Sequence, residues 1–268
     1  MPGNIYEFIH ELTKLNSPQS AQRTQSIAAK IFASWYEKKS TTNTTDTVGD
    51  MMLKAVIFDM DGVLVDSMPY HADAWISVFK DVGINIRRKD IYNIEGSNHI
   101  GIINLVFKKA GRTPEPEDFL RLAKKKHQIF TQINKVKVFD GVYECINSLK
   151  NKCLLGVASG SDRAVVIELI ERFFPKTFTA IVSGNDVLEG KPNPEPYLKA
   201  VEMLKVNKDE CIVIENAPLG VESAKRAGLY CIAIPTYVDP ELLKDADVVL
   251  ANHAMLKEYI MGLDLRAL

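Results

Sequence analysis

The most constraining feature of the chain is the segment over residues 55–67, with the sequence AVIFDMDGVLVDS. Its first four residues are apolar without alternation, a pattern typical of a short parallel strand that is buried on both faces. Asp59 then falls at the carboxyl end of the predicted strand, where open α/β sheets bind their ligands. Asp61 follows two residues later, and Gly62 permits a sharp backbone turn beside it. The segment therefore predicts a parallel α/β sheet with an acidic site at one strand end.

Two carboxylates as close as Asp59 and Asp61 repel each other when both are ionised, so a bound cation or a retained proton is expected. Either arrangement suits phosphoryl transfer, in which one carboxylate attacks phosphorus, the other handles the proton and a metal neutralises the phosphate oxygens. Taken alone, the tetrapeptide Asp-Met-Asp-Gly at residues 59–62 is equally compatible with an acidic surface turn. A calcium loop of the EF-hand type is excluded, because apolar Val63 and Val65 follow where further oxygen ligands are required.

Composition limits the classes of partner. The chain has 268 residues, with 33 basic and 34 acidic side chains. This balance gives no electrostatic footprint for nucleic acid or an anionic membrane, and no apolar run is long enough to span a bilayer. The N-terminus lacks a basic region followed by an apolar segment, so we expect no secretory signal and a cytoplasmic location. The 4 cysteines form no Cys-x-x-Cys pair and are expected to be reduced core thiols.

Residues 1–50 do not follow the strand pattern. Apolar side chains recur at helical spacing over residues 5–15 and again over residues 27–35, and a polar stretch at residues 39–47 is typical of a linker. A helical hairpin that lies on its own domain explains this pattern, and so does a docking or oligomerisation segment. We predict an N-terminal helical extension and linker in a protein that is a monomer or a weak oligomer.

The next part of the chain, residues 69–136, is helical in character. Three amphipathic segments follow one another, at residues 72–82, 102–107 and 119–130, and Gly83 and Gly111 close the first two. Beyond residue 139, short apolar runs predict strands at residues 154–158, 180–182, 212–214, 231–234 and 248–250. Helix-length segments separate these runs, which implies right-handed crossovers and a doubly wound parallel sheet. Residues 51–67 and 137–268 are thus expected to form one α/β core, into which residues 68–136 are inserted.

Polar residues recur beside three more predicted elements. Ser159 and Gly160 lie between a strand and a helix N-terminus, which suits a phosphate as well as an ordinary helix cap. Lys191 lies in the segment GKPNPEP, whose prolines stiffen the approach to a helix, so its side chain is directed either inward or into solvent. Glu215 follows an apolar strand and Asn216 adds a neutral oxygen that suits Mg²⁺, although a capped loop has the same composition.

The order of these segments resembles the four motifs of the haloacid dehalogenase-like hydrolases, specifically the β-phosphoglucomutase-like phosphatase and pyrophosphatase group. The segments GKPNP and ENAPLGV are detailed matches, and the resemblance covers essentially residues 52–268. It implies a Rossmann-like core with a helical cap formed by residues 68–136. It also implies that Asp59 is the nucleophile and that Asp61 is the general acid and base. The phosphate would be bound by Ser159, Gly160 and Lys191. The Mg²⁺ ion would be bound by Asp59, the backbone carbonyl of Asp61, Glu215 and Asn216.

The sequence departs from the commonest pattern at Asn216, where an Asp usually follows the Glu. The change removes one negative charge from the implied metal site. In the cap, the segment that resembles the specificity loop of the family contains Glu95 and His99, where the mutase pattern has basic residues. Glu95 near a phosphate would be repulsive unless it meets Mg²⁺ or a leaving group that needs a proton. His71 is expected either to orient Asp61 or to be solvated on its helix.

The expected function is therefore Mg²⁺-dependent phosphohydrolysis through an aspartyl-phosphate intermediate. Inorganic pyrophosphate or a small phosphorylated metabolite is the expected substrate. The main alternative is a sugar-phosphate mutase, in which Lys124, Lys125 and Lys126 would assist the binding of a second phosphate. A phospho-acceptor signalling domain is a competing class, because receiver-like domains also phosphorylate a strand-end Asp, but it explains neither Asp61 nor the cap.

Overall fold

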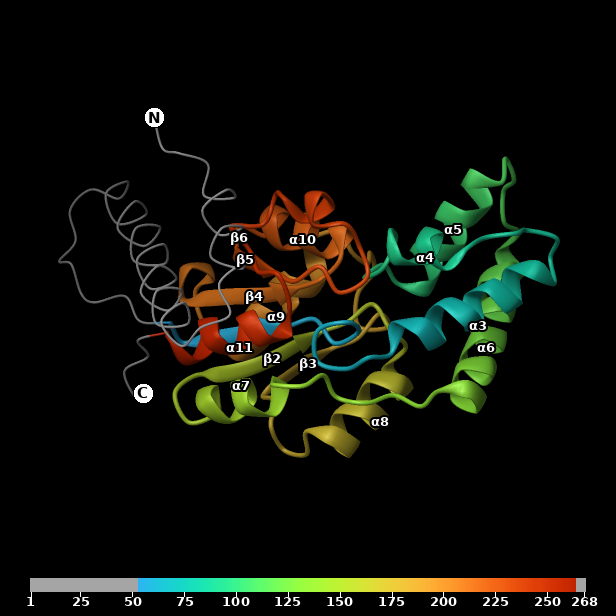
Figure 1. Ribbon diagram of the computed structural model, residues 1–268. Helices are drawn as coiled ribbons and strands as arrows, with labels where there is room; N and C mark the ends of the chain where they lie inside the picture. Colours follow the sequence, from blue (N-terminus) through green and yellow to red (C-terminus); the bar gives the residue numbers. More distant parts are fainter. Residues whose placement is uncertain (1–52, 264–268) are drawn as a thin grey trace.

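The computed structural model describes residues 53–263, so the predicted N-terminal extension lies outside the described residues. Figure 1 shows an α/β core and, beside it, a separate group of helices. The core contains a parallel sheet of six strands in the order β3-β2-β1-β4-β5-β6. The strands are β1 Ala55–Phe58, β2 Leu154–Ala158, β3 Ala180–Val182, β4 Cys211–Glu215, β5 Tyr230–Ala233 and β6 Val248–Val249. The predicted doubly wound parallel sheet is confirmed.

Strand β1 lies between β2 and β4, and their register determines where the polar residues meet. Phe58 is the partner of Val157 in β2 and of Ile214 in β4. The carboxyl ends of the three strands therefore lie at the same edge of the sheet. The predicted strand boundaries differ from the observed ones by one residue at most, and Glu215 is the last residue of β4 rather than the first residue after it.

Alternate residues of β1 face opposite layers of the core, as the period of a strand requires. Val56 and Phe58 pack into a cluster with α7 Val142–Leu149, α8 Arg163–Phe173 and α11 His253–Met261. Ala55 and Ile57 pack on the other face against α9 Glu195–Leu204 and α10 Pro218–Arg226. Two short 3₁₀ helices, Lys208–Glu210 and Pro240–Leu243, complete the described core. The continuous apolar run of β1 is thus explained by burial on both faces.

The inserted helices are α3 Met68–Lys80, α4 Arg88–Tyr92, α5 His99–Lys109 and α6 Pro116–Ile133. They have a hydrophobic cluster of their own, which is built around Trp75, Phe79 and Phe107. Gly83 and Gly111 follow α3 and α5 with positive φ angles, as predicted. The sequence did not reveal α4, because this five-residue helix buries only Ile91 and shows no periodicity. The cap boundaries at residues 68 and 136 stay a prediction.

Two antiparallel chain segments connect the cap to the core. Val65 forms a bridge with Val138, and the Asp66 N–H donates to the Lys137 carbonyl at 2.8 Å. The segments on the two sides of the predicted insertion, at residues 65–66 and 137–138, therefore lie side by side. The 4 cysteines are free and buried. Over residues 53–263, no helix has both the length and the apolar character that crossing a bilayer requires.

The packing predicts a large difference between two leucines. Leu169 in α8 is 0% exposed in the main core cluster, whereas Leu188 in a surface loop is 89% exposed. We expect Leu169→Ala to lower the free energy of unfolding by about 2–5 kcal/mol, because it removes buried methyl groups and leaves a cavity. The matched change Leu188→Ala should alter it by less than about 0.5 kcal/mol. Denaturant midpoints at unchanged slope measure both effects, and equal shifts would contradict the assignment of this core.

Candidate active site

The centre of the site is a buried ion-pair cluster at the carboxyl edge of the sheet. Lys191 Nζ lies 2.6 Å from Asp59 Oδ1 and 2.7 Å from Glu215 Oε1, and it donates to the Ala158 carbonyl at 2.9 Å. Asp59 is 3% exposed and Lys191 is 1% exposed. Lys191 therefore points inward, and the alternative of a solvated lysine is wrong. Three strand ends and the loop before α9 have to meet to form this cluster.

Both carboxylate oxygens of Glu215 are occupied by donors from this chain. Oε1 accepts from Lys191 and also from the Tyr197 hydroxyl at 2.7 Å. Oε2 accepts from the backbone N–H groups of Asn216 at 2.7 Å and Ala217 at 3.0 Å. Within the chain the partners of this buried acid are thus Lys191 and three further donors, and the predicted contact of Glu215 with a metal stays a prediction. Tyr197 was not anticipated, since an aromatic residue within an amphipathic helix gives no signal of a buried hydroxyl contact.

The charges in the cluster shift one another's ionisation. Burial raises the pKa of Asp59 well above its ordinary value, Lys191 opposes this effect, and Glu215 and Asp61 add to it. Burial alone would lower the pKa of Lys191, but Asp59 and Glu215 outweigh burial and raise it. Lys191 is therefore a permanent cation, and one lysine between two acids leaves the cluster short of positive charge.

Asp61 accepts from side chains on both of its oxygens. Oδ1 lies 2.5 Å from the Ser67 hydroxyl and 3.1 Å from His71 Nε2. Oδ2 accepts from the hydroxyls of Ser159 at 2.9 Å and Ser161 at 2.7 Å. Burial by itself raises the pKa of Asp61, but His71 and the hydroxyls together hold it below its ordinary value. Ser67 lies inside the segment over residues 55–67, and Ser161 follows the predicted phosphate-binding residues Ser159 and Gly160. The contacts of both hydroxyls with Asp61 became visible only in the structure.

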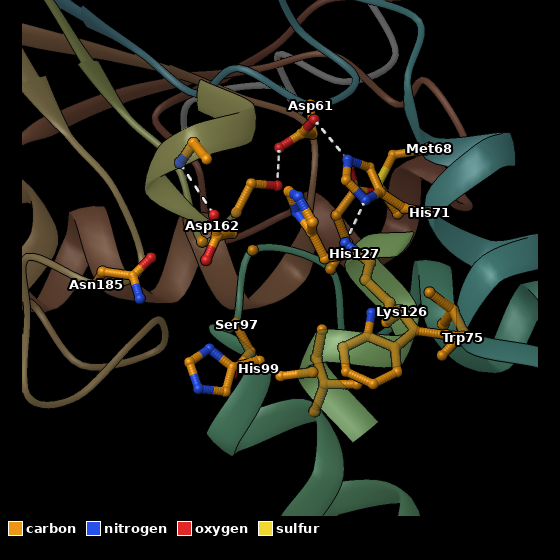
Figure 2. A pocket seen from close by; sticks show the side chains of 18 of the residues that line it. Asp61, Met68, His71, Trp75, Ser97, His99, Lys126, His127, Asp162 and Asn185 are labelled. Atoms are coloured by element: carbon orange, nitrogen blue, oxygen red, sulfur yellow. Dashed lines mark hydrogen bonds and ion pairs between the residues drawn. The ribbon is translucent and has the colours of Figure 1, made fainter. Parts of the chain in front are cut away.

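His71 is buried beside Asp61, so the alternative of a solvated histidine is wrong. Its Nδ1 lies 2.7 Å from Lys126 Nζ, and its ring stacks on Phe130 with 4.1 Å between the centroids. Figure 2 shows His71 between Asp61 and Lys126. Burial lowers the pKa of Lys126 to about 8, and burial together with Lys126 also lowers that of His71. Of the lysines at residues 124–126, only Lys126 contacts His71.

The loop between α4 and α5 is seated directly on the core, and core glycines make the close approach possible. A Cβ atom on Gly160 would lie 2.4 Å from the Gly96 carbonyl oxygen. A Cβ atom on Gly190 would lie 2.7 Å from the Asn98 nitrogen. Such distances exclude any side chain at these positions in the observed arrangement. The cap is therefore closed.

Closure brings the predicted cap residue Glu95 to the predicted metal residue Asn216. The Asn216 amide donates to Glu95 Oε1 at 3.1 Å, and Glu95 is 4% exposed. Burial raises the pKa of Glu95 well above its ordinary value, and the charge of Asp59 adds to this shift. An acid from the cap thus lies where the commonest family pattern has an acid on the core.

Three buried oxygens in this region accept no hydrogen bond from the described chain: Asp59 Oδ2, Asn216 Oδ1 and Glu95 Oε2. Buried polar atoms without partners are costly, and carboxylate and amide oxygens are typical ligands of a hard cation. Within residues 53–263, no group of three or more His, Cys, Asp and Glu side chains is arranged to hold a metal. A cation at this site would therefore depend on the amide oxygen of Asn216 as well as on carboxylates, and this donor set fits Mg²⁺.

A cavity of about 380 Å³ opens beside the cluster and is lined by residues of both the core and the cap. Asp59, Asp61, His71 and Glu95 line it together with Gly160. His99 also lines the cavity, and in Figure 2 it lies on the opposite side of the view from Asp61. The structure thus brings the predicted site residues to one cavity or its immediate wall, while their individual roles stay predictions.

Comparison with known proteins agrees with this architecture. The model of the family described as haloacid dehalogenase-like hydrolase matches residues 56–234. The beta-phosphoglucomutase of Bacillus subtilis is 30% identical over 189 residues, which cover 68% of this chain and 83% of that protein. The phosphorylated carbohydrates phosphatase of Thermotoga maritima is 31% identical over 180 residues, which cover 66% of this chain and 82% of that protein.

A solved structure from Bacteroides vulgatus, provisionally described as a beta-phosphoglucomutase, has a TM-score of 0.77 and 29% identity. The match covers 90% of this chain and 99% of that one. The family match includes β1 with Asp59 and Asp61, the whole cap, Lys191 and the Glu215–Asn216 pair. This chain belongs to the haloacid dehalogenase-like hydrolases, and its relatives and structural neighbours are the β-phosphoglucomutase-like phosphatases of that family.

Proposed function

We propose that this hydrolase is a Mg²⁺-dependent phosphatase in which Asp59 attacks phosphorus and forms an aspartyl-phosphate. The observation that carries the proposal is the state of the Asp59 carboxylate. Lys191 holds Oδ1 at 2.6 Å, while buried Oδ2 has no partner and the residue lines the cavity. A carboxylate that is fixed by one oxygen and free at the other is oriented for in-line attack. Lys191 also offsets charge on the transferring group.

Asp61 is the proposed general acid and base. Its hydrogen bonds favour the ionised form, and this form accepts a proton from the water that cleaves the aspartyl-phosphate. To protonate a leaving oxygen, Asp61 has to carry a proton, which its present donors oppose. We infer that a bound phosphoryl group draws the Ser159 hydroxyl away from Asp61, because charged phosphate oxygens compete with the carboxylate for the hydroxyl proton. The contacts of Asp61 with Ser67, Ser161 and His71 then remain, and the one with His71 is backed by Lys126.

The proposed Mg²⁺ ligands are Asp59, the backbone carbonyl of Asp61 and Asn216, whose Oδ1 is free. Because Oδ2 of Asp59 is the attacking oxygen, the ion would bind this residue through Oδ1, which has a second lone pair beside the one that Lys191 occupies. Glu215 was predicted as a ligand too, but its oxygens already accept from donors of this chain. We propose that Glu215 mainly holds Lys191. The chemistry that the ion supplies when bound is neutralisation of charge on the phosphate oxygens.

The substrate that we propose is a small anion such as inorganic pyrophosphate, or a small phosphorylated metabolite. Glu95 lies at the metal residue Asn216, so the closed cap places an acid, and not an arginine, next to the proposed reaction centre. A mutase requires a cation for its second phosphate. The cap loop over residues 94–98 provides none, although Lys124 and Lys126 of α6 line the cavity. The Thermotoga maritima relative is named for phosphorylated carbohydrates, and the cavity of about 380 Å³ has room for a leaving group of that size. Both substrate classes therefore belong in a test.

Changing Asp59 to Asn should reduce turnover to background, because a neutral amide is a poor nucleophile. We would measure phosphate release from p-nitrophenyl phosphate with Mg²⁺ and look for the covalent phosphate by mass spectrometry after an acid quench. The control Asp140→Asn makes the same chemical change at an exposed position and should behave like the parent. Substantial turnover by Asp59→Asn would rule out Asp59 as the nucleophile. A phosphorylated parent that persists without turnover would favour the signalling class instead.

Changing Asn216 to Asp should tighten Mg²⁺ binding by about tenfold or more, because it adds a charge at the cation. The new acid would also face Glu95 without the present amide donor, so the metal-free variant should unfold at a lower temperature than the parent. Thermal unfolding across a Mg²⁺ titration reports both effects without a substrate. Asn151→Asp on the surface is the control. Unchanged or weaker Mg²⁺ stabilisation would count against Asn216 as a ligand.

A substrate panel should show net phosphate release from pyrophosphate or from a small phosphorylated metabolite. We expect little conversion of β-glucose 1-phosphate to glucose 6-phosphate, because the cap loop over residues 94–98 offers an acid, Glu95, and no cation for a second phosphate. Free phosphate and glucose 6-phosphate would be measured in the same reactions. Efficient isomerisation without phosphate release would overturn the choice of hydrolase over mutase.

A further inference from the structure

The loop that follows β5, residues 234–239, contacts three separate parts of the catalytic architecture. The Thr236 hydroxyl donates to the Gly62 carbonyl at 2.7 Å, in the turn that contains Asp61. The Tyr237 hydroxyl donates to the Asp66 carboxylate, at the first connection between core and cap. The Tyr237 ring stacks on the ring of Tyr92 in the cap, with centroids 4.9 Å apart and planes inclined by 27°. Neither the sequence patterns nor the proposed mechanism assigns Tyr237 or Tyr92 a role.

The ring contact lies close to Glu95 along the chain. Tyr92 is the last residue of α4, and its carbonyl accepts the Glu95 N–H at 3.4 Å. Glu95 in turn accepts from the Asn216 amide. One short turn therefore connects the stacked ring to the acid that lies at the proposed metal site. A displacement of Tyr92 displaces this turn as well.

The hydroxyl contact lies on the core side of the hinge. Asp66 is tied to the second connecting segment, since its N–H donates to the Lys137 carbonyl at 2.8 Å. The bond from Tyr237 to Asp66 therefore joins two groups that need not separate when the cap moves. The Tyr237 ring is half-buried and packs against the hydrophobic cluster of the cap. Opening the cap removes that packing, whereas the hydroxyl bond can keep the ring in place.

We propose that Tyr237 and Tyr92 form a tyrosine latch, which holds the cap closed and positions Glu95 against Asn216. The latch is the stacked pair, and Asp66 is its anchor on the core. A stacked aromatic pair contributes enough beyond simple area burial to change the ratio of closed to open forms by about three- to tenfold. Its importance for catalysis rests on the proposed function, because only there does Glu95 act near the phosphoryl group. The latch itself depends only on the contacts between cap and core.

The latch can be tested without substrate by hydrogen exchange of the full chain. The variants are Tyr237→Leu, Tyr92→Leu and the double variant, and Tyr143→Leu is the control because Tyr143 is 45% exposed on α7. We expect amides of residues 95–98 to exchange about three- to tenfold faster in each single variant. The double variant should add nothing further, since either change removes the same contact. Amides of β1 should be unaffected.

Equal protection of residues 95–98 in the parent and the single variants would overturn the latch, and so would effects that add up in the double variant. Tyr237→Phe keeps the ring and removes only the bond to Asp66. Exchange in this variant should stay within about twofold of the parent, because the stacking is retained. If Tyr237→Leu fails to fold, the comparison of Tyr92→Leu with Tyr237→Phe decides the question, because Tyr92 alone then carries the loss of the stack.

Measurements of activity provide a second test of the latch. With p-nitrophenyl phosphate and Mg²⁺, Tyr237→Leu and Tyr92→Leu should each lower kcat/KM by about three- to tenfold, with Tyr237→Phe close to the parent. Faster exchange of the amides of residues 95–98 in the leucine variants, without any change in kcat/KM, would overturn the proposal that the latch positions Glu95. A parent that releases no phosphate from any substrate would instead overturn the proposed function, and hydrogen exchange would still decide whether the latch exists.

Discussion

The rest of the site depends on the buried contact of Lys191 with Asp59 and Glu215. Each of the three ionisable groups is costly to bury in its charged form, and this cost is offset because they meet one another at 2.6–2.7 Å and have further hydrogen-bond partners. This requirement aligns the ends of β1 and β4 and fixes the segment before α9. It also leaves one oxygen of Asp59 without a partner. The contact that stabilises the buried charges is therefore the same contact that prepares the nucleophile.

The closed cap adds the remaining residues of the site to those that the core supplies. His71 and Lys126 come from cap helices and reach Asp61, while Glu95 comes from the cap loop and reaches Asn216. The loop can approach this closely because the opposing core positions are glycines. Such closure removes water from the cavity and strengthens every charge interaction inside it. The site is thus assembled from two parts that a hinge can separate.

Asn216 and Glu95 are best understood together. The core lacks the second acid of the commonest family pattern, and the cap supplies an acid that binds the amide of Asn216. The negative charge near the proposed metal site therefore depends on cap position. In an open cap the site would hold less charge, so ion binding and closure would favour each other. Such an arrangement suits a small substrate that is enclosed completely.

The sequence by itself determined the strands, the three longer cap helices and the identities of Asp59 and Asp61, because apolar period, glycine ends and strand-end acids are local patterns. Only the tertiary structure decided which side chains meet. Ser161 reaches Asp61 across 100 positions of sequence, and Tyr237 reaches Asp66 across 171. Such contacts depend on strand register and on the seating of the cap, which no local pattern encodes. For the same reason, the sequence showed that Glu215 needs a partner, and the fold supplied Lys191 in that place.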